Sequence, residues 1–497
     1  MDTKRLLLSA AAAIALCACD KWESPPDDPG VALARAQFLA APALQVHGAT
    51  LNVPSKKYPT IGAALSSAKR GDQVRVAAGT YRECPVLVDG VTLVGQPGAT
   101  IDGASCDPAV LGVVSADASI VHGATVQGFT IVDAKRAGVY MNRATGVHVL
   151  DMMFSGNSAL LPREVWMVGS TGSLVARCRF EGGGVLLDDG SAAVLSDLEV
   201  SNSPLGSVRS VRSSFLLERS RIIGSGSTGV SALTGSRAVL VGNEIQGRED
   251  GIRIDSGFLS DGAPSQAWLL DNYVHGNVGV GMRVIGKGSW AYGTGNRYEE
   301  NDLSGVHVTG GATYVGLRES MTANTWDGLV VLGCELFCND AECSPPVIIQ
   351  ERSLVVLNDF EINGNMGDGL WSACDAQVNL AHGSIAHNVG RGAVVASTWD
   401  FGGGNQSYAP SELKVEWTVF DTNRVGAVAR EDSRLILGTL DEPGMNSFLG
   451  NTALAIRNLS TGPVSAQLNW FGTTDAAVIA GSLFGNVTYE PFLTHEP

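Results

Sequence analysis

The sequence predicts an all-β solenoid of parallel strands, and three observations carry this prediction. A Gly followed by alternating apolar residues recurs along the chain, every 22 to 24 residues where the repeat is clean. The chain contains 61 Gly in 497 residues, and only 17% of its residues are charged. An Asn commonly stands four residues before the repeated Gly. Self-similarity at this period is the signature of stacked structural repeats.

The composition excludes several classes of protein. An apolar fraction of 44% is large enough to bury a core, which excludes global disorder. A net charge of −16 argues against nucleic acid as a partner, because such binding depends on basic side chains that release counterions. The same charge disfavours anionic lipid headgroups. A polyanionic ligand would therefore need a local basic patch or a bridging cation.

The N-terminus indicates export. Lys4 and Arg5 precede an apolar run from Leu6 to Leu16, which is too short to span a bilayer comfortably. The following Cys17-Ala18-Cys19 resembles a bacterial lipobox. This resemblance implies a signal peptide over residues 1–18 and lipidation of Cys19; ordinary secretory cleavage is the alternative. We expect a lipid-anchored protein of the bacterial cell envelope or surface, secreted if it is not lipidated.

Residues 19–49 are predicted to form a flexible tether, because their first part is polar and rich in Pro. Contact with the membrane is then expected only through the lipid. Residues 50–497 form the repeat domain, for which we expect a monomer.

The Cys residues fall into groups that an exported protein can oxidise. Cys84 and Cys106 are 22 residues apart, and Cys178 stands alone. The remaining group is Cys334, Cys338, Cys343 and Cys374. Its spacing permits a zinc site, but in this compartment we favour disulfides, and Cys374 follows the strand next to the Cys-rich segment.

Each repeat is long enough for about three short strands and three turns. Strand alternation turns the residue after each Gly inward and the next one outward. Stacked coils of this kind form a parallel β-helix, in which roughly sixteen coils would each rise about 4.8 Å. The recurring Asn suits a tight turn and could bond to the Asn of the next coil, so we interpret it as structural. These Asn are Asn277, Asn301, Asn324, Asn365 and Asn388.

Both ends of the repeat domain resemble right-handed β-helix proteins of the pectin-lyase-like superfamily. The segment from Tyr58 to Gly103 contains a short apolar-faced stretch after Thr60, then Gly71-Asp72 and the turn Gly79-Thr80-Tyr81. The segment from Asn469 to Leu493 resembles the end of such proteins. The resemblance implies a single-stranded right-handed parallel β-helix with a short N-terminal capping helix. It does not imply one activity, since the superfamily includes lyases, hydrolases, esterases, epimerases and proteins with no known reaction.

One outward strand face carries the candidate site. Arg253, Arg283 and His307 follow the repeated Gly on three consecutive coils, about 4.8 Å apart. Carboxylates accompany them, and an aromatic side chain stands at one end: Asp250, Asp255, Asp327 and Trp371. A row of cations beside carboxylates could hold a sugar chain. The alternative is that exposed strands carry such charges for solubility alone.

Three insertions follow this same strand and are expected to border the face that carries the candidate site. Functional residues concentrate on such loops. The three insertions cover roughly residues 257–266, 334–346 and 398–411.

The chemistry of this face stays open between two routes. The pair Glu249-Asp250 is similar in position to an acidic pair of polygalacturonases, and hydrolysis of a glycoside needs two carboxylates. Other positions of that family's pattern hold Thr228, Val280 and Thr309 instead. A pectate-lyase-like route would use Arg253 or Arg283 as base, with Ca²⁺ held by carboxylates such as Asp250 and Asp255.

Two hypotheses follow for the function. In the first, the protein binds an extracellular polysaccharide of uronate type, and Asp250, Arg253 and Arg283 cleave it as a lyase or hydrolase. In this case Asp255, His307, Asp327 and Trp371 bind the chain, and Ca²⁺ is the only cofactor suggested. In the second, the protein is a non-enzymatic surface rod, acting as an adhesin or an envelope scaffold.

Overall fold

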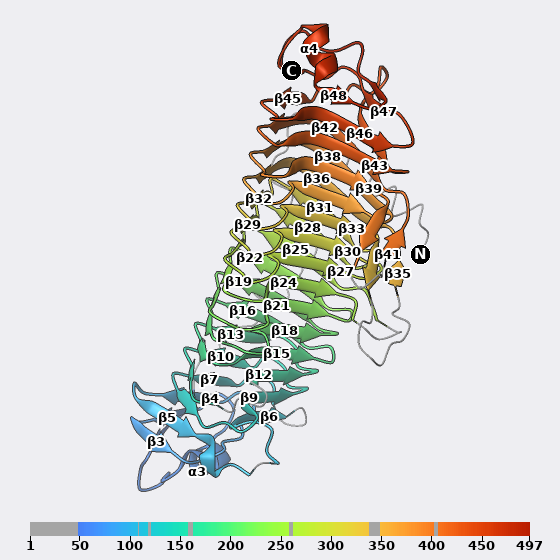
Figure 1. Ribbon diagram of the computed structural model, residues 1–497. Helices are drawn as coiled ribbons and strands as arrows, with labels where there is room; N and C mark the ends of the chain where they lie inside the picture. The colour runs from blue at the N-terminus through green and yellow to red at the C-terminus, as the bar shows by residue number, and fades with distance from the viewer. Residues whose placement is uncertain are drawn as a thin grey trace. The chain divides into compact units, whose positions relative to one another are not determined.

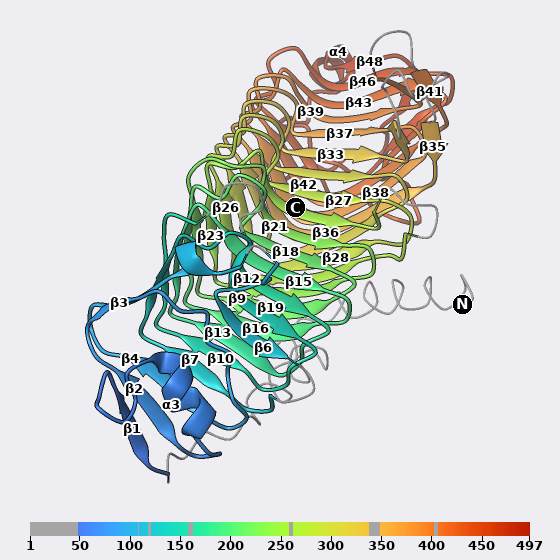
Figure 2. The same ribbon diagram turned by 90° about the horizontal axis from the view of Figure 1, so that it is seen from below.

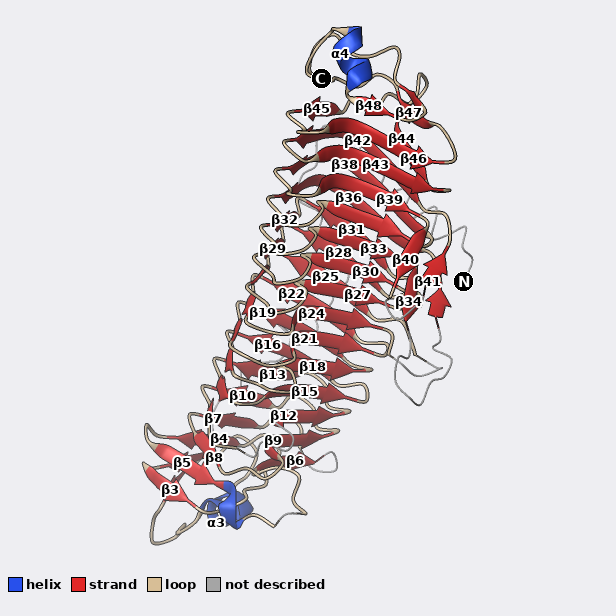
Figure 3. Ribbon diagram, in the orientation of Figure 1, coloured by secondary structure: helices blue, strands red, loops and turns tan. Residues whose placement is uncertain are grey.

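The computed structural model of the chain consists almost entirely of strands wound into stacked coils (Figures 1 and 3). It describes residues 48–107, 109–117, 121–157, 163–257, 262–336, 348–401 and 406–497. All of these lie in the larger of two units into which the chain divides, residues 43–497. The described residues include no helix long and apolar enough to cross a membrane. The predicted signal peptide, Cys19 and nearly all of the tether lie outside the described residues.

Each coil crosses three faces. One face is a 15-stranded sheet, made of β6 (Val114–Asp117), β9 (Ala137–Asn142), β12 (Arg163–Val168), β15 (Gly184–Asp188), β18 (Val208–Val211), β21 (Thr228–Leu233), β24 (Asp250–Asp255), β27 (Met282–Ile285), β30 (Val306–Thr309), β33 (Leu329–Leu332), β37 (Leu370–Ala373), β39 (Arg391–Ala396), β43 (Val425–Glu431), β46 (Leu454–Ser460) and β48 (Leu483–Phe484).

The second face follows the first in each coil. It is made of β1 (Thr50–Val53), β2 (Gln73–Val76), β4 (Thr92–Gly95), β7 (Thr125–Gln127), β10 (His148–Leu150), β13 (Ser173–Ala176), β16 (Ala192–Ser196), β19 (Ser214–Glu218), β22 (Arg237–Val241), β25 (Gln266–Leu270), β28 (Trp290–Thr294), β31 (Thr313–Leu317), β36 (Ser353–Asn363), β38 (Ala376–Ala386), β42 (Glu412–Asp421), β44 (Arg434–Gly438), β47 (Val464–Ala466) and β49 (Val487–Thr488).

The third face is made of short strands, namely β3 (Gly79–Tyr81), β5 (Ala99–Asp102), β8 (Thr130–Val132), β11 (Met153–Phe154), β14 (Arg179–Glu181), β17 (Glu199–Ser201), β20 (Arg221–Ile223), β23 (Glu244–Gln246), β26 (Tyr273–His275), β29 (Arg297–Glu299), β32 (Ser320–Thr322) and β45 (Ser447–Leu449). The long strands β36, β38 and β42 run across both the second and the third face, so the two faces form one 30-stranded sheet.

Neighbouring coils pair in parallel on every face. β21 pairs with β24, β22 with β25, and β23 with β26, each in register. The predicted parallel β-helix with three strands per coil is therefore confirmed, and its roughly sixteen predicted coils are close to the 15 strands of the first face.

The core lies inside the coils and follows the predicted alternation. The residues directly after the repeated Gly are fully buried: Val230, Ile252, Met282, Val306, Leu329 and Leu370. Aromatic side chains stack between coils within this core, as Phe154 does on Phe180 at 4.9 Å between ring centroids. Such stacking adds to the stabilisation from apolar burial.

The predicted Asn column forms a continuous ladder. Asn277 donates from Nδ2 to Oδ1 of Asn301 at 2.8 Å, and Asn301 donates in the same way to Asn324 at 2.9 Å. The ladder continues through Asn365, Asn388, Asn423 and Asn451. The left-handed backbone lies one residue before each Asn, as at Glu300 and Ala323, and not at the Asn itself. The Asn is therefore required for its hydrogen bonds, because buried polar groups must be paired.

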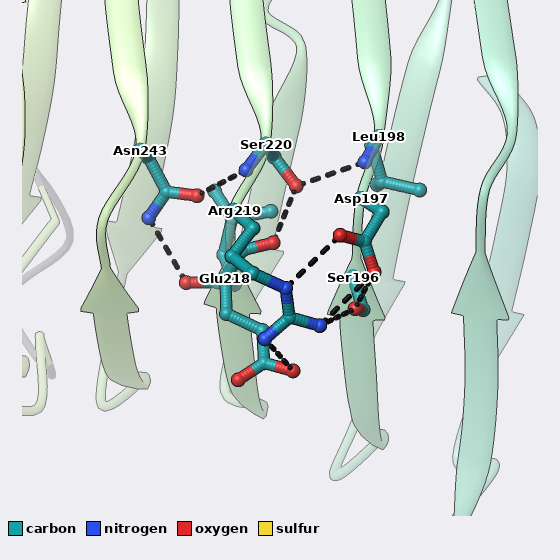
Figure 4. A network of polar contacts seen from close by, with 8 residues as sticks. Ser196, Asp197, Leu198, Glu218, Arg219, Ser220 and Asn243 are labelled. Carbon is teal, nitrogen blue, oxygen red and sulfur yellow. Dashed lines mark hydrogen bonds and ion pairs between the residues drawn. The ribbon is translucent and has the colours of Figure 1, made fainter.

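A second polar column stands at another turn of the coil (Figure 4). The backbone N–H of Leu198 donates to Oγ of Ser220, and that of Ser220 donates to Oδ1 of Asn243. Beside this column, Arg219 forms an ion pair of 3.0 Å with Asp197, and both residues have left-handed backbone. The turns are thus fixed by side chains that bond from one coil to the next.

Helices close the two ends of the stack (Figure 2). Thr60 caps α3 (Ile61–Ser67), which buries Ile61, Ala64 and Leu65, so the predicted capping helix is confirmed. Both carboxylate oxygens of Glu83 accept from the first N–H groups of α3. A short helix, α4 (Ala476–Gly481), lies near the C-terminus and was not predicted.

Two disulfides are present, Cys84–Cys106 and Cys334–Cys374. The disulfide interpretation is confirmed for these four residues, and Cys374 ties the Cys-rich insertion to the next coil as predicted. The two other Cys of that insertion lie outside the described residues. Cys178 is buried with a free thiol, and burial raises its pKa to about 12.

Candidate functional site

The outward side chains of the 15-stranded sheet form a single row, which we call the outer row. Strand register places its members opposite one another from coil to coil. They are Tyr140, Trp166, Leu186, Arg209, Ser231, Arg253, Arg283, His307, Val330, Trp371 and Val394. The predicted neighbourhood of Arg253, Arg283 and His307 is therefore confirmed in the fold.

Each of the two central arginines has a carboxylate partner. Arg253 donates from Nη2 to Oδ2 of Asp255 at 2.7 Å, and Arg283 donates from Nε to Oδ1 of Asp250 at 2.9 Å. Both arginine side chains keep 26% of their surface exposed, whereas Asp250 and Asp255 are buried. The expected basic row is therefore a row of ion pairs, because a carboxylate buried beside a strand needs a cation or donors to remain charged.

Asp250 also fixes the backbone of the next coil. Its Oδ1 accepts from the N–H of Val280 at 3.2 Å, while Glu249, one residue earlier, is exposed. The two members of the predicted acidic pair therefore point different ways, as strand alternation requires. Asp250 positions Arg283 and is not free to act beside Glu249.

His307 is held in a neutral state. Burial, with Arg283 nearby, lowers the pKa of its imidazole to about 3. Its Nε2 is buried and has no hydrogen-bond partner among the described residues. His307 is therefore a neutral imidazole with a buried Nε2, and it is not the cation that the sequence suggested.

Glu335 joins this cluster and was not predicted from the sequence. It lies in β34 (Cys334–Leu336), which pairs antiparallel with β35 (Ile348–Gln350). The pKa of its carboxyl is raised to about 7, chiefly by burial and also by Asp255, while Arg253 and Arg283 act in the opposite direction. Glu335 is thus close to both ion pairs and exchanges its proton near neutral pH. We call Asp250, Arg253, Asp255, Arg283, His307 and Glu335 the central cluster.

Asp327 belongs to a separate group, three coils from Asp250 and so roughly 14 Å away. Its Oδ1 accepts from the N–H of Asp368 at 2.7 Å, and Asp368 forms an ion pair with Arg391. Burial raises the pKa of Asp327 to about 6. The structure does not bring Asp327 together with the central cluster.

Trp371 is only partly exposed, because neighbouring side chains pack on its ring. Arg391 and Arg430 lie over its ring, at 4.8 and 5.9 Å from the ring centroid, and its Nε1 is buried. The ring also contacts Trp399 of β40 (Thr398–Asp400), which pairs with β41 (Gln406–Tyr408). Trp371 is thus half-buried beside an insertion, and its role in binding a sugar chain stays a prediction.

The insertions build a small second core outside the coils. Figures 1 and 2 show β35 and β41 side by side next to the stack. Beneath them lie outward side chains of β33, β37 and β39 that are fully or nearly buried: Val330, Leu332, Ala373, Val394 and Ala396. The predicted wall thus covers the C-terminal part of the outer row and leaves the central cluster beside it.

A Ca²⁺ site is not assembled by these carboxylates. Among the described residues, no group of three or more His, Cys, Asp or Glu side chains could hold a metal ion. Asp250 and Asp255 each bind an arginine, so neither offers the set of oxygens that Ca²⁺ requires.

A family model agrees with the fold. Residues 163–320 match the family described as right handed beta helix region. No curated protein matches the sequence of this chain. The tailspike protein 3 of bacteriophage CBA120 is similar over 88% of this chain and 61% of its own, with 11% identity and a TM-score of 0.40. The chain thus spans less than two thirds of that tailspike.

Two further solved structures resemble the chain. The A-module of mannuronan C-5 epimerase AlgE4 from Azotobacter vinelandii is 13% identical, over 90% of this chain and 98% of its own, with a TM-score of 0.33. Pectin methylesterase from Aspergillus niger is 15% identical, over 46% of this chain and 86% of its own, with a TM-score of 0.30. The pairing of its coils gives the chain a parallel β-helix fold, and the match of residues 163–320 to a right-handed β-helix family agrees with it.

Proposed function

We propose that the protein binds an acidic polysaccharide of uronate type along the outer row, and that the central cluster is where it acts on the chain. One observation carries the proposal: Arg283, His307 and Glu335 converge on neighbouring coils with three different charge states. Arg283 is a cation, His307 is neutral, and Glu335 has a pKa of about 7. Perturbed acids beside fixed cations are typical of functional sites.

Each group has a role that its geometry supports. Asp250 holds Arg283 by Nε at 2.9 Å, which orients its guanidinium for the carboxylate of a uronate. His307 adds no charge of its own beside Arg283, because its buried imidazole is neutral. Glu335 can exchange a proton near neutral pH, which is the requirement for a general acid or base.

The reaction that these groups support best is lyase cleavage. A base removes the proton from the carbon beside the uronate carboxylate, the bond to the leaving glycosidic oxygen breaks, and a carbon–carbon double bond forms. Arg283 would stabilise the charge that develops on the carboxylate, and Glu335 would take the proton. Hydrolysis is the second route, in which Glu335 and Asp255 would be the two carboxyl groups.

The test uses the full chain with polygalacturonate, alginate and amylose. We expect binding of the two acidic polymers and ultraviolet-absorbing unsaturated ends from one of them. The double variant Arg253→Ala, Arg283→Ala should lose binding by about tenfold or more, since each charge-assisted contact is strong. Arg237→Ala, an exposed arginine on the opposite 30-stranded sheet, is the matched control.

The results of this test distinguish the two functional hypotheses, which are action on a polysaccharide and a non-enzymatic surface rod. New reducing ends without unsaturated products would point to hydrolysis. Unchanged binding in the double variant, with intact polymers, would overturn the proposal and leave the non-enzymatic surface rod as the function.

We further propose that the protein is exported and anchored by a lipid at Cys19. The support is the basic and apolar N-terminal pattern before Cys19. Mass spectrometry of the protein from its native membrane should find an acylated N-terminal Cys19. The Cys19→Ala variant should still leave the cytoplasm, but it should be found in the soluble fraction instead of the membrane. Wild-type protein that carries no lipid would overturn the proposed anchor.

A further inference from the structure

A hollow of about 160 Å³ opens on the outer row, well away from the central cluster. It lies over β12, β15 and β18 and is lined by Arg163, Val185, Leu186, Asp188, Leu205, Gly206, Arg209 and Val211. Four coils separate β12 from β24, which amounts to roughly 19 Å along the stack. The hollow and the central cluster are thus two places on one face.

The hollow carries positive charge that the protein does not neutralise. In the described part of the chain, neither Arg163 nor Arg209 has a carboxylate oxygen within 4 Å, unlike Arg253 and Arg283. Burial lowers the pKa of Arg163, Asp188 raises it, and Arg209 and Arg136 lower it. Arg163 therefore has two other cations and one acid around it, in a chain whose net charge is −16.

Asp188 is engaged by an aromatic side chain. Its Oδ2 accepts from Nε1 of Trp166 at 3.1 Å. Arg163 lies over the same Trp166 ring, at 4.4 Å from the ring centroid, and Tyr140 packs against the ring edge-on at 5.1 Å. These contacts hold the guanidinium of Arg163 in place before any ligand arrives, which reduces the entropy cost of binding.

Apolar side chains complete the hollow. Leu186 is buried below it, and Leu205 is 51% exposed at its rim, in the turn before β18. A small inorganic anion would leave Leu205 in water. A ligand with an anionic group and an apolar face would use both the arginines and the leucines.

We propose that this hollow binds the carboxylate-bearing sugar unit of an acidic polysaccharide, as a second site on the same face as the central cluster. Arg163 and Arg209 hold the carboxylate, and the sugar ring packs against Leu186 and Leu205. The polysaccharide nature of the ligand rests on the proposed function, but the binding of an anionic sugar does not require any reaction at the central cluster.

The test measures binding of trigalacturonate to the full chain, with maltotriose and inorganic sulfate as comparisons. Trp166 touches Arg163, so we expect trigalacturonate to change the tryptophan emission, and Trp166→Phe to remove that change. Arg163→Ala and Arg209→Ala should each weaken binding by about tenfold. Arg209→Lys should fall between the wild type and Arg209→Ala, because lysine keeps the charge and loses the bidentate geometry.

The controls separate this site from the central cluster. Arg237→Ala removes one exposed cation from the other sheet and should bind trigalacturonate as the wild type does. Arg283→Ala should also leave trigalacturonate binding at the hollow unchanged, even if it abolishes cleavage. If Arg283→Ala abolishes cleavage but keeps the Trp166-dependent emission change with trigalacturonate, the hollow is a binding site separate from the central cluster. This conclusion does not depend on which reaction the central cluster performs.

Three results would overturn the inference. They are unchanged affinity in Arg163→Ala and Arg209→Ala, equal affinity for maltotriose, and equal affinity for sulfate. Equal affinity for sulfate would mean that Leu186 and Leu205 contribute nothing to a sugar.

Discussion

Asn277 lies against Gly251 of the preceding coil, so closely that a Cβ on Gly251 would fall 3.1 Å from its Nδ2. The same Cβ would fall 2.5 Å from the carbonyl oxygen of Gly281. The relation repeats along the stack, between Gly281 and Asn301, Gly305 and Asn324, Gly328 and Asn365, and Gly369 and Asn388. The Gly column is therefore required by space, and the two columns of the sequence repeat are one structural device.

Replacing one of these glycines should destabilise the stack. In Gly281→Ala the new Cβ would lie 2.5 Å from the carbonyl oxygen of Gly305 and 2.9 Å from Nδ2 of Asn301. We expect a loss of about 1–3 kcal/mol in the free energy of unfolding, measured by denaturant titration, because backbone must move. Gly462→Ala, where a Cβ meets nothing within 4 Å, should change it by less than about 0.5 kcal/mol. Equal effects in the two variants would contradict the spatial explanation.

Breaking the Asn ladder should cost stability through unpaired neighbours. Asn324 donates to Oδ1 of Asn365 at 3.0 Å and accepts from Nδ2 of Asn301 at 2.9 Å, all in the buried turn. Asn324→Ala leaves buried donors and acceptors without partners, which costs about 1–3 kcal/mol. Calorimetry should show a lower Tm, while Asn52→Ala, on the exposed side of β1, should keep the wild-type Tm. A wild-type Tm in Asn324→Ala would show that water replaces the ladder.

A buried carboxyl should make stability fall with rising pH. Glu319 lies at the end of the ladder of Asn243, Asn272 and Asn296, and burial raises its pKa from 4.5 to about 8. The folded chain therefore keeps a proton that the unfolded chain releases between these two values. The stabilisation that comes from Glu319 is complete below the unfolded pKa of 4.5. It is lost as the pH rises toward the folded pKa of about 8, by about 1.4 kcal/mol per pH unit.

Glu319→Gln should remove this slope, because an amide has no proton to release. Denaturant titrations at about pH 5 and about pH 8 measure the difference between the two pH values. The part-exposed control Glu412→Gln should retain the wild-type slope. An unchanged slope in Glu319→Gln would show that Glu319 is already ionised in the folded chain.

Binding of an acidic polysaccharide should weaken as Glu335 ionises. Its pKa of about 7 means that it is mainly neutral below that pH and mainly anionic above it. We expect the affinity for polygalacturonate to fall between about pH 6 and about pH 8, since a new anion beside Arg283 competes with the ligand. Affinity electrophoresis of Glu335→Gln should show a flat profile in this range. A slope that persists in Glu335→Gln would place the titrating group elsewhere.

For the central cluster, the sequence predicted the positions of the residues but not their charge states. Register along the Gly repeat correctly placed Arg253, Arg283 and His307 on neighbouring coils, because pairing fixes which residues face one another. Their charge states could not be predicted in the same way. A pKa depends on burial and on partners that arrive from other segments, such as Glu335 from an insertion.

Trp371 illustrates the same limit. Its outward position followed from the repeat, but the repeat does not determine how much of an outward side chain stays exposed. Strands β34–β35 and β40–β41 come from two of the predicted insertions and pack on that part of the outer row, and the sequence could not show which outward side chains they would bury.

The sequence by itself determined the coil, its period, the inward residues, the capping helix and the Asn ladder, because each depends on contacts that repeat from one coil to the next. Only the tertiary structure decided which outward charges pair, that Glu335 joins the central cluster, and that Arg163 and Arg209 line a hollow beside Trp166. These features depend on single, non-repeating contacts, and a periodic pattern carries no information about where an insertion or a turn comes to rest.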